Sequence, residues 1–175
     1  MNTVKTGRFL SLILRHKPEE IGLKLDSEGW ANVAELLKKG NMDMATLEEI
    51  VATNNKKRFK FNDDKTKIRA SQGHSVRVDL KLEPQIPPDN LFHGTATHFL
   101  SSIYEKGLVA GSRQQVHLSS DKDTAINVGQ RHGKPIVLNV NAKVMSDDGI
   151  KFYLSDNGVW LTDHVPIKYL TVLGR

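Results

Sequence analysis

The stretch "LEPQIPPDN", residues 82–90, divides the 175-residue chain into two halves of different character. Its prolines fix their own backbone and restrict the residue before each of them, so neither a helix nor a central strand fits there. The stretch therefore predicts an extended linker between an N-terminal lobe, residues 1–81, and a C-terminal lobe, residues 91–175.

The N-terminal lobe shows a helical pattern three times and then a hairpin pattern. We expect helices over about residues 3–16, 31–39 and 46–54. Strands at residues 58–62 and 67–71 flank the turn "DDKT". Two pairs have the spacing of a capping box, namely Asn32 with Glu35 and Thr46 with Glu49. Three helices followed by a hairpin is the element order of a winged helix.

The C-terminal lobe consists mainly of short apolar strands, "NLFHGT", "VHLSS", "PIVLNV", "KFYLSD" and "VWLT". One helical pattern stands among them, "ATHFLSSIYEKG", with Gly107 at its expected C-cap. Strands of this number and length predict a small mixed or mostly antiparallel sheet. The fold class expected for the whole chain is α+β.

Composition narrows the kinds of chemistry that are available. The chain has no cysteine, which excludes disulfides, thiolate nucleophiles and cysteine-bound zinc. It has no apolar stretch long enough to span a membrane and no signal-peptide pattern. We therefore expect a cytoplasmic protein, a monomer, with no membrane partner.

The net charge of +5 favours a polyanionic partner. Residues 1–80 hold 15 of the 25 Lys and Arg residues but 11 of the 20 Asp and Glu residues, so most of the excess lies in this part. The N-terminal lobe is therefore the expected contact for RNA.

The stretch "SLILRHKP", residues 11–18, ends a helical pattern with three cations, Arg15, His16 and Lys17. Cations at the last turn of a helix neutralise its unpaired carbonyl groups, so this cluster has a purely structural explanation. The alternative is that Arg15 and His16 bind an anion. Both explanations stay open on this stretch alone.

A second polar cluster follows the predicted hairpin in "IRASQGHS". Arg69, Gln72, His74 and Ser75 lie within seven residues of one another, and we take the last three as candidate substrate-binding groups. Arg113, in "GSRQQVHLSS", adds a guanidinium from the other lobe. Forked guanidinium donors on separate segments suit a phosphate.

Two strands of the C-terminal lobe carry a histidine followed by a hydroxyl residue two positions later. They are His93, Gly94 and Thr95 in "HGT", and His117 and Ser119 in "HLS". Such a pair fits the acid and base of an RNA phosphoesterase, or two strand histidines with a structural role. The chain has no Gly-rich phosphate loop, and we expect no bound metal because no ligand cluster has metal spacing.

Four motifs, "LRHKPEEIGLKLDSEGW", "IRASQGHS", "FHGT" and "RQQVHLS", follow the order and approximate spacing of the tRNA 2′-phosphotransferase family, which the chain resembles over nearly its whole length. The resemblance implies a winged-helix lobe joined to an ADP-ribosyltransferase-like lobe that binds NAD. It also implies RNA carrying a 2′-phosphate as substrate. That phosphate attacks C1″ of the nicotinamide ribose and releases nicotinamide. The ribose 2″-OH then attacks phosphorus, which leaves 2′-OH RNA and ADP-ribose 1″,2″-cyclic phosphate.

The resemblance also implies roles for individual residues. The family's Arg-His-Arg-Arg tetrad falls on Arg15, His16, Arg69 and Arg113, with His16 as an acid for the departing 2′-oxygen. The NAD pocket takes His93, Gly94 and Thr95, with His117 and Ser119 close by. No glutamate follows Glu105, which suits an acceptor that arrives already ionised.

Two alternatives belong to other classes of protein or of reaction. One is a winged-helix module that only binds nucleic acid, with a structural second lobe. The other is an ADP-ribosyltransferase that stops after the first step on a terminal phosphate. Consumption of NAD distinguishes the first from the proposed enzyme, and the phosphate product distinguishes the second.

Overall fold

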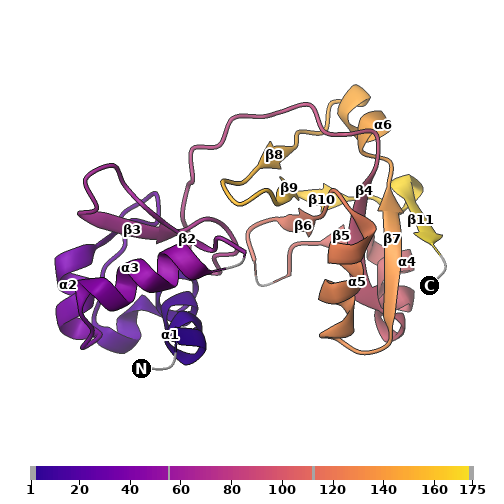
Figure 1. The fold of residues 1–175 in the computed structure, drawn as a ribbon. Helices are drawn as coiled ribbons and strands as arrows, with labels where there is room; N and C mark the ends of the chain where they lie inside the picture. The colour runs from indigo at the N-terminus through magenta and orange to yellow at the C-terminus, as the bar shows by residue number, and fades with distance from the viewer. Residues whose placement is uncertain (1–2, 55, 112, 174–175) are drawn as a thin grey trace. The chain divides into compact units, whose positions relative to one another are not determined.

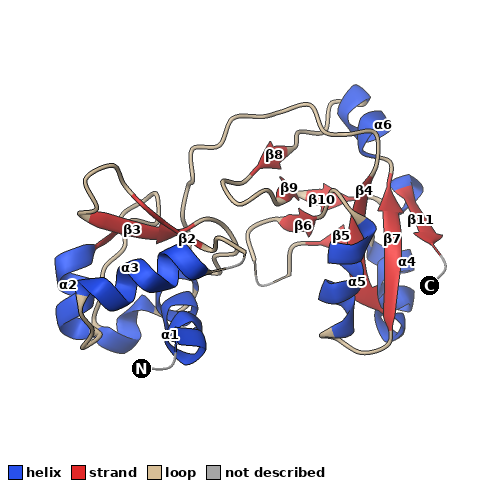
Figure 2. Ribbon diagram, in the orientation of Figure 1, coloured by secondary structure: helices blue, strands red, loops and turns tan. Residues whose placement is uncertain are grey.

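The computed structural model describes residues 3–54, 56–111 and 113–173. Over these residues the chain is a mixed α and β protein with six α-helices and several small sheets (Figures 1 and 2). Its internal contacts divide it into two compact units, Met1–Lys81 and Leu82–Arg175. Within the described ranges, none of the helices has the length and apolar character needed to cross a membrane.

Among its described residues, the first unit contains three α-helices, one 3-10 helix and one antiparallel sheet. The helices are α1 (Thr3–Arg15), η1 (Pro18–Ile21), α2 (Val33–Lys39) and α3 (Met44–Thr53). The strands are β1 (Ala31–Asn32), β2 (Phe59–Phe61) and β3 (Lys67–Ala70). Their order in the sheet is β1-β3-β2, so β3 is the central strand.

Helix α1 buries one apolar stripe in the core of this unit. Leu10, Ile13 and Leu14 are 0% exposed, and their spacing of three and four residues puts them on one face of the helix. They pack with Leu36, Leu47 and the inward residues of the sheet. The predicted helix over residues 3–16 is confirmed to within one residue.

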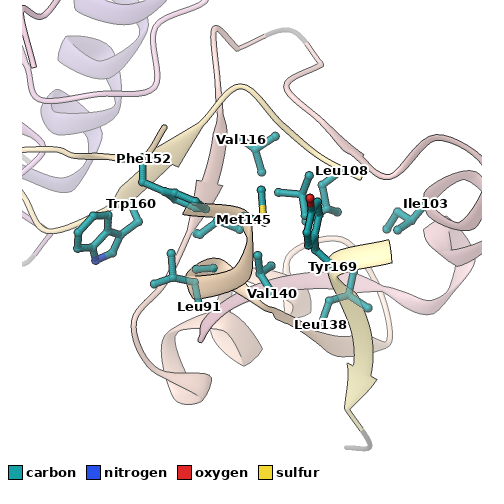
Figure 3. Packing of buried hydrophobic residues seen from close by; sticks show 13 residues of the cluster. Leu91, Ile103, Leu108, Val116, Leu138, Val140, Met145, Phe152, Trp160 and Tyr169 are labelled. Carbon is teal, nitrogen blue, oxygen red and sulfur yellow. The ribbon is translucent and has the colours of Figure 1, made fainter. Parts of the chain in front are cut away.

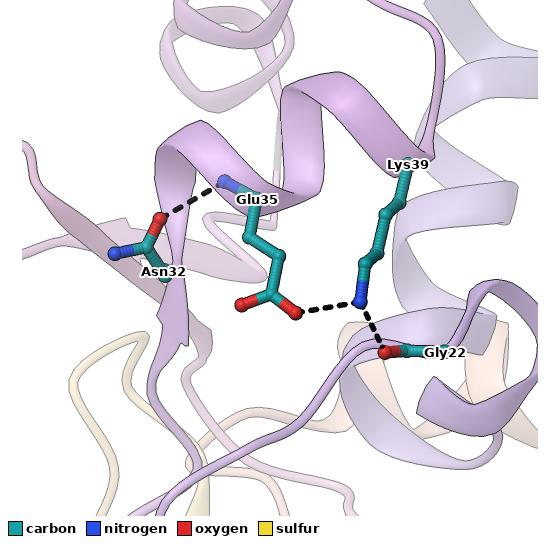
Figure 4. A network of polar contacts seen from close by, with 4 residues as sticks. All are labelled: Gly22, Asn32, Glu35 and Lys39. Carbon is teal, nitrogen blue, oxygen red and sulfur yellow. Dashed lines mark hydrogen bonds and ion pairs between the residues drawn. The ribbon is translucent and has the colours of Figure 1, made fainter.

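Helix α2 begins two residues later than the sequence pattern predicts, because Ala31 and Asn32 pair with β3 instead. The predicted cap is correct, since Asn32 Oδ1 accepts a hydrogen bond of 2.9 Å from the Glu35 amide (Figure 4). The Glu35 carboxylate accepts from Lys39 Nζ at 2.7 Å, and Lys39 also donates to the Gly22 carbonyl. Glu35 is thus engaged along its own helix.

The predicted cap of the third helix is wrong. Helix α3 begins at Met44, and its N-cap is Asp43, whose carboxylate accepts from the Thr46 amide at 2.8 Å. Thr46 is therefore in the first turn and not at the cap. A carboxylate at this position also interacts favourably with the helix dipole. The hydrogen bonds that Asp43 accepts from Thr46 lower the pKa of Asp43.

The second unit contains three α-helices, two 3-10 helices and eight short strands among its described residues. The helices are η2 (Thr97–Phe99), α4 (Leu100–Lys106), α5 (Lys122–Gln130), α6 (Ala142–Asp147) and η3 (Ile167–Tyr169). The strands are β4 (Leu91–Ala96), β5 (Leu108–Val109), β6 (Val116–Leu118), β7 (Pro135–Val140), β8 (Tyr153–Leu154), β9 (Trp160–Thr162), β10 (His164–Val165) and β11 (Leu170–Leu173). They form sheets of order β11-β7-β4, β6-β9-β8 and β10-β5, all antiparallel.

One apolar cluster joins these sheets. Leu91, Val140, Met145 and Phe152 come from different elements, are at most 1% exposed and pack together (Figure 3). The stretch 82–90 belongs to this unit by its contacts. The amide of Gln85, in this stretch, donates to the carbonyl of Phe152, in the body of the unit, at 2.8 Å.

The prediction of a single helix in this half is wrong, since α5 and α6 accompany α4. The predicted C-cap of α4 is confirmed, because Gly107 has φ 74° and its amide donates to the Ile103 carbonyl at 2.7 Å. The sequence of α5, "KDTAINVGQ", carries a glycine and few strong helix formers, so its intrinsic propensity is low.

Helix α5 is held by close packing on strand β4. A Cβ added to Gly94 would overlap the main-chain carbonyl oxygen of Ala125. A Cβ added to Gly129, one turn further along α5, would lie 2.6 Å from the Thr95 carbonyl oxygen. Gly94 therefore has a packing role, whatever it contacts besides.

We expect Gly94→Ala to destabilise the protein, because α5 must move away from β4 to admit the new methyl group. The loss in the free energy of unfolding should be about 3 kcal/mol, as for other overpacked sites. Thermal and urea unfolding of the full chain would measure it.

Gly7→Ala is the matched control. The same added methyl group there lies 4.0 Å from its nearest neighbour, Ile50, on a regular helix where alanine is favoured. We expect it to be neutral or stabilising. Equal stability of the Gly94→Ala variant and the wild type would disprove the packing role of Gly94.

Candidate functional site

In the first unit, the loop after β3 closes over the end of α1. The amides of Ser75 and Val76 donate to the Arg15 carbonyl at 2.9 and 3.2 Å. The His16 Nδ1 atom lies 2.8 Å from Ser75 Oγ. Loop amides thus bind one of the exposed carbonyls of the helix end, so the cations there are not needed for that carbonyl.

Two arginines are almost fully buried in this region. Arg15 is 7% exposed, and its Nη1 donates to Ser11 Oγ at 3.3 Å. Arg69 is 8% exposed; its guanidinium lies 4.4 Å from the centre of the Trp30 ring, and its Nη1 donates to the Glu28 carbonyl at 3.2 Å. Stacking and a main-chain acceptor fix the direction of the Arg69 guanidinium.

Gln72 and His74, on the loop that follows β3, are buried, at 8% and 3% exposure, and the charges of Arg15 and Arg69 act on His74. Gln72 Oε1 and His74 Nε2 have no hydrogen-bond partner among residues 3–54, 56–111 and 113–173. Leaving such an atom without a partner costs about 1–3 kcal/mol, so each one needs an explanation. A bound ligand that donates to Gln72 and contacts His74 would provide it.

His74 stays neutral at ordinary pH. Burial, followed by the charges of Arg15, Arg69 and His16, lowers the pKa of His74 to about 4. The backbone of Gly29, with φ 85°, passes so close that an added Cβ would lie 3.3 Å from His74 Nε2. A side chain at position 29 would therefore crowd the imidazole.

We expect His74 to make the protein less stable in mild acid. The unfolded chain protonates this histidine near pH 6.5, whereas the folded chain resists down to about pH 4. Stability is therefore full above pH 6.5 and falls between pH 6.5 and 4, by up to about 3 kcal/mol. Urea unfolding across this range would measure it. His74→Gln should flatten the slope, and an unchanged slope would show that His74 is not the group that titrates.

In the second unit, a pair of reciprocal main-chain hydrogen bonds joins strand β4 to the residue that follows β6. The amides and carbonyls of Phe92 and Ser119 bond to each other at 2.8 Å in both directions. The His93 Nδ1 atom lies 3.2 Å from the His117 carbonyl. A carbonyl only accepts, so Nδ1 of His93 carries the proton and its Nε2 is an acceptor. Burial lowers the pKa of His93, which favours this neutral form.

Arg113 and His117 form a second defined contact. Arg113 Nη1 lies 2.6 Å from His117 Nδ1. A guanidinium only donates, so Nδ1 accepts and the proton of His117 lies on Nε2. The two histidines of the predicted HGT and HLS pair therefore have opposite tautomers, with an acceptor on His93 and a donor on His117.

The end of helix α5 adds two basic residues that the sequence analysis did not assign. Partial burial of the Arg113 guanidinium lowers its pKa, and the charge of Arg131 lowers it further. The charge of His132 acts on His93. Neither is found from sequence, because their position depends on how α5 packs on β4.

The structure brings the sequence-predicted residues together in two groups. Within the first unit, Arg15, His16, Arg69, Gln72, His74 and Ser75 gather around the end of α1. Within the second, His93, Thr95, Arg113, His117 and Ser119 lie on or beside β4 and β6. Trp30 is a further member of the first group. The sequence could have indicated Trp30, because this residue ends the "LDSEGW" turn, one residue before β1.

The first group defines a class of site. Buried guanidinium groups, a helix-end histidine and neutral polar side chains are the groups by which proteins commonly bind a phosphate.

Comparison with known proteins identifies the class more closely. The family model described as "RNA 2'-phosphotransferase, Tpt1 / KptA family" matches residues 1–164. A protein of Agrobacterium fabrum is 60% identical, over 95% of this chain and 92% of its own length. One of Acaryochloris marina is 56% identical over 93% of both chains. One of Fusobacterium nucleatum is 55% identical over 97% of this chain and 98% of its own. Each is named "Probable RNA 2'-phosphotransferase".

The chain belongs to the RNA 2′-phosphotransferase family. The resemblance drawn from the four sequence motifs is thereby confirmed.

Proposed function

We propose that the protein is an NAD-dependent RNA 2′-phosphotransferase. It removes an internal 2′-phosphate from RNA, as at a tRNA splice junction, and gives 2′-OH RNA, nicotinamide and ADP-ribose 1″,2″-cyclic phosphate. Residues 1–81 act as a winged-helix-like RNA-binding lobe, 82–90 as a linker, and 91–175 as an ADP-ribosyltransferase-like lobe. The observation that carries the proposal is the buried group of Arg15, Arg69, Gln72 and His74 in a member of this family.

The first group of residues receives the RNA phosphate. Arg15 and Arg69 provide forked donors for its oxygens, and the stacked, buried position of Arg69 limits the entropy lost on binding. His16, held by Ser75, is the proton source for the 2′-oxygen that leaves. Gln72 Oε1 accepts from a ribose hydroxyl, which satisfies an atom without a partner among the described residues.

The second group fits NAD, which supplies the ADP-ribosyl group and a good leaving group. His93 Nε2 is an acceptor for a ribose hydroxyl, and His117 Nε2 is a donor on the neighbouring strand. Thr95 and Ser119 add hydroxyl groups, and Arg113 adds a cation for a phosphate. Gly94, between His93 and Thr95, keeps the strand close to α5.

The bonds formed and broken balance over two steps. In the first, a phosphate oxygen bonds to C1″ and nicotinamide leaves with the electrons of the glycosidic bond. In the second, the 2″-OH loses its proton as its oxygen bonds to phosphorus, and the RNA 2′-oxygen leaves and takes a proton, so the protons balance. Arg15 and Arg69 bind the non-bridging oxygens, whose charge grows only in the second step.

The direct test uses a short RNA with one internal 2′-phosphate, with and without NAD. We expect loss of the phosphate and release of nicotinamide only when NAD is present. Phosphate loss without NAD would indicate the phosphoesterase, and RNA binding without any reaction would indicate a binding module. ADP-ribosylated RNA as the final product would indicate the one-step transferase.

We expect Arg69→Ala or His16→Ala to accumulate ADP-ribosylated RNA. The first step joins a dianion to a cationic centre, so a lost cation costs it little. The second step loses a charge-assisted hydrogen bond, which is worth roughly 1.5–3 kcal/mol, or about ten- to more than hundredfold in rate. Gel analysis of RNA with a labelled 2′-phosphate would resolve both steps.

Arg8→Ala is the control, because Arg8 is an exposed arginine on the same helix as Arg15. It should behave as the wild type. If Arg15→Ala, His16→Ala and Arg69→Ala all keep wild-type rates for both steps, the cations at residues 15–17 only complete a helix end.

We expect His93→Ala to slow nicotinamide release by at least tenfold, because the ribose loses the acceptor that orients C1″. His164→Ala is the matched control. That histidine also contacts a main-chain carbonyl of the second unit, Lys106, at 2.8 Å, but lies on β10. Normal nicotinamide release by the His93→Ala variant would exclude His93 from the NAD pocket.

A further inference from the structure

The sheet of the first unit has one apolar face and one basic face. Phe59, Ile68 and Ala70 point into the core and are at most 4% exposed. Side chains alternate along a strand, so Lys60, Lys67 and Arg69 lie on the opposite face. We name this opposite side the outer sheet face and define it by Trp30, Arg58, Lys60, Lys67 and Arg69.

The strand register places these cations next to one another. Lys60 pairs directly with Arg69, and directly opposed residues have Cβ atoms about 5 Å apart. Lys67 stands two residues from Arg69 on β3, about 7 Å along the strand. Lys60 and Lys67 are exposed, whereas Arg69 is buried under Trp30.

The outer sheet face continues in both directions from Arg69. On one side, β1 continues the register back to Trp30, whose ring stacks on the guanidinium. On the other, the Ser71 amide donates to the Arg58 carbonyl at 2.8 Å, which extends the ladder beyond β2. The acidic end of the hairpin is engaged locally, since Asp64 accepts from the amide and hydroxyl of Thr66.

We propose that the outer sheet face binds the backbone of single-stranded RNA on the nucleotides next to the one that carries the 2′-phosphate. This rests on the proposed function, in which Arg69 receives that phosphate. Lys60 and Lys67 then contact phosphates of the flanking nucleotides, and they carry no role in the chemistry.

The charges and their position favour RNA over other polyanions. Lys67 lies two residues from the buried Arg69 along the same strand, and Lys60 lies opposite Arg69 on the neighbouring strand. A linear chain of phosphates with one branching phosphate matches that arrangement. Backbone contacts of this kind carry affinity without sequence preference, as an enzyme that reads a 2′-phosphate requires.

The test compares Lys60→Gln/Lys67→Gln with Lys24→Gln/Lys38→Gln in the full chain. The control removes two exposed lysines of the same unit that lie outside the sheet. The probe is a short fluorescein-labelled RNA, with and without one internal 2′-phosphate. Anisotropy gives its Kd over a salt series without NAD.

We expect the salt slope of Lys60→Gln/Lys67→Gln to fall by about 1.4, which corresponds to about 25-fold weaker binding at 0.1 M salt. The loss should be the same for both RNAs, because the lysines contact ordinary phosphates. Arg69→Ala should instead remove the preference for the 2′-phosphorylated RNA. Lys60→Arg/Lys67→Arg should restore binding, which excludes misfolding as the cause.

Binding of both RNAs by Lys60→Gln/Lys67→Gln at the level of the control would overturn the proposal. Nicotinamide release by the wild type is measured in parallel, because it tests the proposed function by itself. A wild type that releases none, together with the expected loss of binding, would reject NAD chemistry and leave the RNA surface standing. An active wild type with unchanged binding in the double variant would reject the surface alone.

Discussion

The register of strand β3 is the constraint on which the first unit depends. Ile68 and Ala70 must enter the core, so Lys67 and Arg69 must leave it on the other side. A slip of one residue would bury two cations in the apolar core and expose the two apolar side chains. Because the register is fixed, Arg69 meets Trp30, which directly precedes β1, and Lys60 on β2. The same strand therefore stabilises the core and aims the arginine that we assign to phosphate.

The cations of the first unit are held close together at an electrostatic cost. Burial lowers the pKa of His74 most, and the charges of Arg15, Arg69 and His16 lower it further. A neutral imidazole among cations adds no repulsion and still presents a polar edge. An arriving phosphate dianion changes this balance, because it stabilises each positive charge that it approaches. The arrangement thus favours an anionic ligand, and the unfavourable contacts are kept because the core and the 71–76 loop fix the side chains.

Sequence patterns predicted the elements that are marked by their own residues, through apolar spacing or a capping residue. Leu10, Ile13 and Leu14 define α1, and Gly107 ends α4. The elements that were missed depend on contacts made elsewhere in the chain. Helix α5 has low propensity and forms because Gly94 and Gly129 let it approach β4. The late start of α2 follows from pairing of Ala31 with Ile68. The same limit applies to the site. The motifs supplied its histidines and arginines and contained Trp30 without giving it a role, which strand register shows. Arg131 and His132 join the site only through the packing of α5.

The chemistry of the two groups differs in a way that agrees with the proposed reaction. No glutamate follows Glu105 in the sequence, so the stretch that carries Arg113, His117 and Ser119 has none to deprotonate an acceptor. A hydroxyl acceptor would need such a base, but a phosphate is ionised at neutral pH. A carboxylate beside it would also repel it. The cations of the first unit suit the RNA phosphate of the proposed reaction. The neutral imidazoles of opposite tautomer in the second unit suit the proposed NAD. In the proposed reaction the dianion needs charge, whereas the ribose hydroxyls need one directed acceptor and one directed donor, the roles that we propose for His93 and His117.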